Sequence, residues 1–392
     1  MPTVPAVPGD RISRIATRVS TIELLFDLVF VFTISRVAEI VVHHPDWTGV
    51  GQAAVVLALV WWMVDAYAWL TNQTAPDTTF VRLALIAAMA GFLVLALAVP
   101  EAFGATGVLF GAAWIAVAVI HAALFIQRGG RGAAGRMLVV GPANVLVGVL
   151  LICSGFVEGP IDWVLFTLPF VAFLGSALLS ARGGFDPGVS HMVERHGLLM
   201  IIAFGESIIS IGVTASAHEL DAALLAGIVL AVGVVAALWW CYFAGDDRRA
   251  EEAMSAADPR RRTGLALTAF YLEHLAMIFG LVLLAAGLHD LLAEPTHAVP
   301  LPAALLTGGG AGLYLLADAS YRTTLRLGPA GWRALGAAAA TATAWAGVAG
   351  SGLLQLALLV AVVVALLALE RAGARRTVRD RSTAADTAGA VG

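Results

Sequence analysis

The segment TIELLFDLVFVFTISRVAEIVV, residues 21–42, indicates a membrane protein. It is long and apolar enough to cross a bilayer as a helix, since about 20 residues span the hydrocarbon core. It nevertheless carries four charged residues, Glu23, Asp27, Arg36 and Glu39. Charged side chains inside membrane segments usually face a bundle interior or a wet cavity. Glu23 and Asp27 are four residues apart and share one helical face, so we interpret this segment as a membrane helix with a functional inner face.

The rest of the chain is comparably apolar. Of its 392 residues, 60% are hydrophobic and only 13% are charged, whereas about 25% is usual for a soluble domain. The apolar runs are continuous rather than alternating, which favours helices over the roughly ten-residue strands of a membrane β-barrel. The composition therefore predicts an all-α fold, a polytopic transmembrane helical bundle.

About twelve apolar runs of spanning length can be counted, and Gly or Pro marks many of the short connectors between them. We place the runs at 21–42, 51–70, 81–99, 104–126, 136–156, 161–181, 191–213, 222–244, 264–289, 303–321, 331–350 and 352–370. We expect residues 1–20 to form a cytoplasmic N-terminal segment. We expect residues 371–392, which are charged and then small and polar, to form a disordered cytoplasmic tail.

The arginines indicate the orientation of the chain. It has no lysine, and apart from Arg36 and Arg195 every arginine lies in or beside the termini and connectors that face one side if the N-terminus is inside. The six outward connectors contain none. The positive-inside rule therefore favours an even number of spans, with both termini in the cytoplasm.

The two halves of the chain resemble each other. Asp27 precedes Trp61 by 34 residues, and Glu206 precedes Trp239 by 33. We therefore predict two six-helix repeats, residues 21–181 and 191–370. Because each repeat has an even number of spans, both would have the same orientation and be related by an axis along the membrane normal.

A second segment with buried charge is HMVERHGLLMIIAFGESIISIGVTAS, residues 191–216. Glu194 and Arg195 lie near its cytoplasmic end. Glu206 lies about three helical turns deeper, near the bilayer midplane. We consider two interpretations of Glu206, a carboxyl group hydrogen-bonded between the repeats and a proton or cation site.

Other polar residues fall in the cytoplasmic halves of their helices. Asp65 follows the Trp61–Trp62 pair, whose simplest role is packing. Glu273 and His274 are adjacent and point about 100° apart, so we expect them to make different contacts. The simplest interpretation of Asp318 is a local ion pair with Arg322, one turn away. The simplest interpretation of His121 is a histidine hydrogen-bonded inside the helical bundle.

Several motifs are missing from the sequence. It contains no Walker A, HExxH, GxSxG or CxxC motif, and no basic tract interleaved with aromatic residues that would indicate nucleic-acid binding. We therefore expect no catalytic site, no metal and no cofactor. The expected partners are the lipid bilayer and a small solute or cation, and no nucleic acid.

The chain resembles the bacterial low temperature requirement A family. ELLFDLVFVFTISRVA (residues 23–38) is similar to that family's E-L-F-F-D-L-V-F-V-F-A motif, with Leu25 in place of an aromatic residue. HMVERHGLLMIIAFGESIISIG (residues 191–212) is similar to its H-x-x-E-R-x-G-L-x-x-I-I-x-L-G-E-S motif, with Phe204 in place of leucine. The resemblance implies a multi-pass protein of the bacterial cytoplasmic membrane. The motif positions it carries over are Glu23, Asp27, Glu194, Arg195, Gly205, Glu206 and Ser207.

A more distant similarity is to endolysosomal and bacterial potassium channels, which carry an Arg followed by Phe-Ser-Asp on the first helix of each six-helix repeat. Here Arg18 precedes Phe26–Asp27 at a longer spacing and without the Ser, and the second half has Gly205–Glu206–Ser207.

The leading functional hypothesis is a secondary transporter or permease, coupled to protons. Asp27 and Glu206 would be equivalent carboxylates at the repeat interface, because protonation changes their charge and can bias the two halves between packings. The other predicted substrate- or ion-binding residues are Glu23, Asp65, Glu194, Arg195, Ser207, Glu273 and His274. The alternatives are a passive potassium or proton channel and a membrane-embedded enzyme or structural factor acting on lipid.

Overall fold

The computed structural model describes residues 20–73, 78–128, 130–180 and 188–389, and in these ranges the chain is helical with no strand. The all-α fold class is therefore confirmed. The helices of the first half are α1 (Thr21–His43), α2 (Trp47–Gln73), α3 (Thr79–Ala98), the 3-10 turn η1 (Val99–Glu101), α4 (Gly107–Arg128), α5 (Gly130–Ser154) and α6 (Pro160–Ser180). Those of the second half are α7 (Val189–Ser216), α8 (Ala222–Phe243), α9 (Asp246–Ala256), α10 (Pro259–Leu265), the π-helix η3 (Ala266–Glu273), α11 (His274–Ala293), α12 (Leu301–Leu325), α13 (Gly331–Ala349) and α14 (Gly352–Gly389).

The helices coincide with the predicted apolar runs to within several residues, and the run at 264–289 lies in the continuous segment α10–η3–α11. In the described ranges, seven helices are long and apolar enough to cross a membrane. They are Trp47–Thr71, Thr79–Glu101, Gly107–Gln127, Val189–Ser216, Ala222–Ala256, Arg261–Ala293 and Gly352–Gly373. α1 has the length but carries four charged residues, which lower its hydropathy.

Helix ends follow the local sequence. α1 begins after Ser20, whose backbone N–H and hydroxyl group both donate to the carboxylate of Glu23 at 2.7 Å, a capping box. Gly245, at φ 108°, makes the sharp turn from α8 into α9. Glycine accepts this left-handed backbone conformation without a steric penalty, so the chain can turn sharply from α8 into the amphipathic helix α9.

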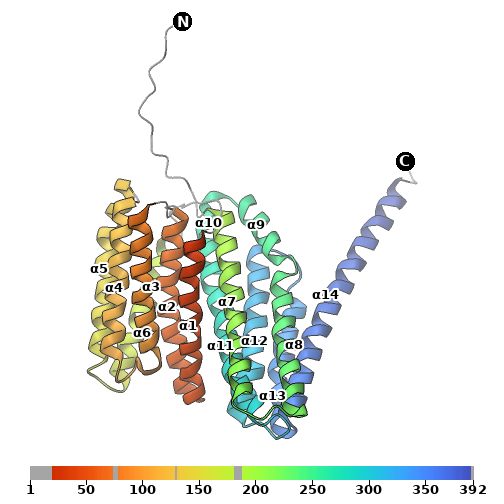
Figure 1. The fold of residues 1–392 in the computed structure, drawn as a ribbon. Coiled ribbons are helices and arrows are strands. Elements are labelled where there is room, and N and C mark those ends of the chain that lie inside the picture. Colours follow the sequence, from red (N-terminus) through yellow and green to blue (C-terminus); the bar gives the residue numbers. More distant parts are fainter. Residues whose placement is uncertain (1–19, 74–77, 129, 181–187, 390–392) are drawn as a thin grey trace.

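The two halves have matching packing. In the first half α1 packs on α2 and α3, α3 on α4, α4 on α5, and α6 on α2 and α5. In the second half α7 packs on α8 and α11, α11 on α12, α12 on α13, and α14 on α8 and α13. Figure 1 shows the two groups of helices side by side, with α1 of the first group and α7 of the second at the boundary where the groups meet.

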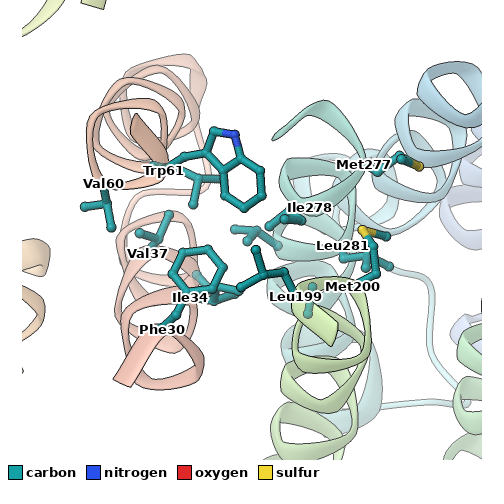
Figure 2. Packing of buried hydrophobic residues seen from close by; sticks show 14 of the residues in the cluster. Phe30, Ile34, Val37, Val60, Trp61, Leu199, Met200, Met277, Ile278 and Leu281 are labelled. Carbon is teal, nitrogen blue, oxygen red and sulfur yellow. The ribbon is translucent and has the colours of Figure 1, made fainter. Parts of the chain in front are cut away.

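A hydrophobic core joins the halves where α1, α2, α7 and α11 meet. Figure 2 shows side chains of α1 and α2 facing those of α7 and α11 across this contact. The labelled residues are Phe30, Ile34, Val37, Val60, Trp61, Leu199, Met200, Met277, Ile278 and Leu281, all buried. The indole N–H of Trp61 donates to the backbone carbonyl of Tyr271 in η3 at 3.0 Å, so a hydrogen bond also crosses the contact.

A cytoplasmic segment was predicted at the N-terminus and a disordered tail at the C-terminus. Residues 1–19 lie outside the described part of the chain. The backbone of α14 continues as helix to Gly389, beyond residue 371, where the composition predicted a disordered tail. The Ala- and Arg-rich sequence after residue 371 has good intrinsic helix propensity, which accounts for the continuation.

Candidate functional site

A cluster of charged side chains lies between the first turns of α1 and α7. Glu23 and Asp27 lie one turn apart on α1, and His191 and Arg195 one turn apart on α7. Because the two helices lie side by side and start at the same end, the two pairs face each other. All four side chains are almost fully buried, and we call them the α1–α7 charge cluster.

The α1–α7 charge cluster is held by short contacts between the halves. Arg195 Nη2 lies 2.7 Å from Asp27 Oδ1, and Arg195 Nη1 lies 4.0 Å from Glu23 Oε1. His191 Nε2 lies 3.2 Å from the same Glu23 oxygen. Two carboxylates of the first half therefore contact one guanidinium and one imidazole of the second half, and the guanidinium supplies the opposite charge that buried carboxylates require.

A narrow pocket reaches this cluster from the side of α2 and α3. It is lined by Ile22, Glu23, Phe26, Tyr67, Thr71, Leu85 and Arg195. The space inside it does not admit a water molecule, so in this packing it is a narrow gap between side chains and not a cavity that holds a ligand.

A second group of polar side chains is centred on His196, which directly follows Arg195 on α7. His196 Nδ1 lies 2.9 Å from the carbonyl of Met192 and donates to it. His196 Nε2 therefore faces Asp65 of α2, with an oxygen at 3.5 Å. The Asp65 side chain is 34% exposed, so this pair connects the buried cluster with a more open surface.

His274, at the start of α11, extends this group within the second half. Its Nδ1 donates to the carbonyl of Ala269 at 2.7 Å, so its Nε2 accepts from the Tyr242 hydroxyl group at 2.9 Å. The rings of His196 and His274 pack edge to face, with centroids 5.2 Å apart. His274 directly follows the π-helix η3, and π-helical turns are frequent at functional sites.

Glu273 points away from its neighbour His274, as predicted from the angle between adjacent helical residues. Its carboxylate accepts hydrogen bonds from Ser320 at 2.6 Å and Thr324 at 2.7 Å, both on α12. Both residues therefore belong to the packing of the second half, where Glu273 contacts α12 and His274 contacts α7 and α8.

Glu206 lies deeper on α7 and accepts a hydrogen bond from Ser35 of α1. It is buried, and Ser207 beside it is fully buried. Ser35 is eight residues beyond Asp27, which corresponds to about 12 Å along α1. Asp27 and Glu206 thus both lie between α1 and α7, but the structure places them at separate levels rather than in one site. Glu194 is exposed on α7.

A further charged cluster lies within the second half. Arg333 of α13 contacts Asp318 of α12, Glu370 of α14 at 2.9 Å and Asp246 of α9 at 3.3 Å. Arg322 contacts Glu370 at 3.0 Å. The predicted local pair between Asp318 and Arg322 is therefore wrong, because Arg333 from the next helix takes Asp318 and Arg322 turns to α14.

The simpler predictions for other polar residues are confirmed. His121 is buried, with Nε2 3.2 Å from the carbonyl of Ala66. Trp61 and Trp62 are packing residues, and Trp62 stacks on Phe173 with ring centroids 4.4 Å apart. Among the described residues no three His, Cys, Asp or Glu side chains are grouped to hold a metal ion.

Three residues of this site were not singled out from the sequence. His191 and His196 lie in the same motif as Glu194 and Arg195, and their spacing from Arg195 on a helix was a usable indication. Ser35 had no such indication, because its role depends on the side-by-side contact of α1 with α7.

Together, the fold and the site define a helical membrane protein with a buried carboxylate, arginine and histidine network between its two halves. The chain belongs to the bacterial low temperature requirement A protein (LtrA) family, whose sequence model matches residues 18–368. It is also similar to an uncharacterized protein of Rhizobium meliloti (strain 1021), with 28% identity in an alignment of 315 residues that covers 76% of this chain and 76% of the relative. No solved structure matches the chain.

Proposed function

We propose that this protein is a proton-coupled secondary transporter of the bacterial cytoplasmic membrane that carries a small solute or cation. The observation that carries the proposal is the 2.7 Å pair between Asp27 of the first half and Arg195 of the second. Intramembrane ionisable residues typically mark proton relays and substrate paths. The proposal includes no catalytic step.

Proton coupling follows from the chemistry of this pair. When Asp27 is ionised, it attracts Arg195 and holds α1 against α7. When Asp27 takes up a proton, this attraction is lost and Arg195 keeps only Glu23 as a charged partner. Protonation therefore changes the relative stability of the two packings of the halves, which is how a ligand shifts a conformational equilibrium. His196 and Asp65 would pass the proton between the cluster and the open surface.

The packed contact favours a transporter over a fixed channel. Side chains fill the space between the halves around Trp61 and Ile278 (Figure 2). A solute can therefore pass only if the halves move relative to each other. Such rocking about a central site is the usual mechanism of transporters built from repeats.

The proposed architecture is twelve spans in two parallel six-helix repeats, with both termini in the cytoplasm. The matching order of helix packing in the two halves supports it. The positions of the helix ends also support this architecture. The start of α7 contacts α9 through Ser190 and Glu251, and α9 contacts the end of α12 and the start of α13 through Asp246. These ends share one side of the bundle, as alternating spans require.

The test is flux in reconstituted vesicles that contain a pH-sensitive dye. With an imposed pH gradient, a pool of amino acids, sugars or monovalent cations added outside should collapse the gradient when it contains the substrate. Asp27→Asn and Glu206→Gln should reduce this flux at least tenfold, whereas Arg248→Gln, on the exposed side of α9, should not.

Two results would overturn the proposal. One is a wild-type protein that responds to none of the pools. The other is an unchanged flux in both carboxylate variants. A steady ionic current in the absence of any solute or pH gradient would indicate the channel alternative instead.

A further inference from the structure

The end of α1 that leads to α2 carries charge on a face that the described part of the chain leaves partly open. Arg36 and Glu39 form an ion pair, yet their side chains remain 29% and 33% exposed. His43 Nε2 lies 3.7 Å from Glu39. Arg36, Glu39 and His43 lie on one side of the helix by their spacing, and we call them the α1 polar face.

This face lies within membrane depth. Arg36 is seven residues before the end of α1 at His43, which is about 10 Å along the helix. Trp47 begins α2 beyond that end and is 88% exposed. Tryptophan is typical of the boundary between lipid and water. Arg36 therefore lies on the lipid side of this boundary.

Other outer helices of the bundle have a different surface. The exposed residues of α8 are Leu, Ala, Val and Trp, and those of α14 as far as Leu369 are Leu, Ala and Val. Such surfaces suit contact with lipid chains. Charged side chains within a membrane almost always face protein or water instead, so the α1 polar face differs from these lipid-facing surfaces and suits a contact with protein.

We propose that a second copy of this chain covers the α1 polar face, forming a dimer with its twofold axis along the membrane normal. The face carries both signs of charge on adjacent turns and is therefore complementary to itself. In a symmetric contact, Arg36 of one copy reaches Glu39 of the partner subunit, and the reverse pair forms at the same time. Each ion pair then gains a second partner and loses its exposure to lipid.

The neighbouring surface fits the close approach of helices. Leu25 and Leu28 extend the face along α1, and both are at least half exposed. On α7, which packs against α1, Gly205 and Gly212 lie two turns apart, and a Cβ added at either would meet no atom within 4 Å. Small residues at such positions let membrane helices pack closely, and in the described part of the chain no atom fills the space beside them.

This inference does not depend on the transport proposal, because it concerns the outer surface of α1 and not the contact between the halves. The first test measures association in nanodiscs or bilayers at low protein density, by single-molecule subunit counting. We expect the wild-type chain to be dimeric. Arg36→Glu and Glu39→Arg should each lower the dimer fraction at least tenfold, because each places like charges across the symmetric contact.

Mixing these two variants provides the decisive comparison. When Arg36→Glu and Glu39→Arg chains carry different affinity tags and are co-expressed, they should form mixed dimers, since each supplies the charge the other lacks. A role of the ion pair within one chain alone does not predict this rescue. A monomeric wild-type chain, or variants that dimerise like the wild type, would overturn the proposal.

A milder variant covers the case in which charge reversal prevents folding. In a Cys153→Ser chain, Leu28→Cys should form an intermolecular disulfide under mild oxidation. Val229→Cys, on the exposed apolar face of α8, is the matched control and should not. Equal cross-linking at both positions, or none at Leu28→Cys, would contradict the dimer.

Discussion

Arg195 of α7 lies 2.7 Å from the carboxylate of Asp27 of α1, and each side chain is only 2% exposed. The same guanidinium lies 4.0 Å from Glu23. One arginine of the second half thus balances two carboxylates of the first. Arg195 therefore has two charged partners, and replacing Arg195 should affect stability differently from replacing Asp27.

Replacing Arg195 should destabilise the protein more than replacing Asp27. Arg195→Gln leaves Glu23 and Asp27 buried with only His191 as a basic neighbour, and breaking a buried pair in this way costs about 3–5 kcal/mol. Asp27→Asn leaves Arg195 paired with Glu23 and should cost less. The double variant Asp27→Asn/Arg195→Gln should recover part of the loss. Unfolding in detergent, followed by circular dichroism, measures all three, and a double variant less stable than Arg195→Gln would contradict the arrangement.

Adjacent glycines on α12 should respond in opposite directions to alanine. A Cβ at Gly310 would lie 2.5 Å from the backbone nitrogen of Leu284 and 2.7 Å from the carbonyl of Gly280, both on α11. Gly310→Ala should therefore push α11 and α12 apart and cost about 1–3 kcal/mol. Gly309 has no atom within 4 Å of the same position. Gly309→Ala should be neutral or stabilise the helix by up to about 1 kcal/mol.

Melting temperatures of the two glycine variants in the same detergent provide the measurement. Because both substitutions add the same methyl group to the same helix, a change in helix propensity cannot explain a difference between them. Equal melting temperatures would show that α11 and α12 are not in backbone contact at Gly310.

Much of the fold could be predicted from the sequence because hydropathy alone marks the helices. The run at 222–244 matches α8 (Ala222–Phe243) almost residue for residue. The spacing of Glu23 and Asp27 also predicted a shared face, which the structure places against α7. These features depend on helical periodicity, which is local in the chain.

The carboxylate with which each buried arginine pairs could not be predicted, because the pairing depends on which helices pack together. Arg322 has the right spacing for Asp318, but Glu370 of α14 and Asp246 of α9 lie close enough to compete for it. The π-helix η3 likewise has no marker in the sequence, although it precedes His274 directly. Tertiary contacts between distant segments decided both outcomes.

The Arg333 cluster should be a major contributor to stability of the second half. Arg333 contacts three carboxylates, those of Asp318, Glu370 and Asp246. Arg333→Gln removes the charge that balances them and should cost about 3–5 kcal/mol. Arg333→Lys keeps the charge but lacks the planar fork that reaches several carboxylates, so its loss should be intermediate. Arg248→Gln, at an exposed position, should lie within about 0.5 kcal/mol of wild type, and a similar loss there would contradict a specific role.

The orientation of the bundle can be tested with single cysteines in a Cys153→Ser chain, since Cys241 is buried. Glu219, in the connector between α7 and α8, and Arg248, on α9, are both exposed. They lie at opposite ends of α8, so they should lie on opposite sides of the membrane. The arginine distribution places Arg248 inside. A membrane-impermeant maleimide should therefore label Glu219→Cys in intact cells and Arg248→Cys only after permeabilisation. The reverse pattern would place the arginine-rich connectors outside and would remove the basis for cytoplasmic termini.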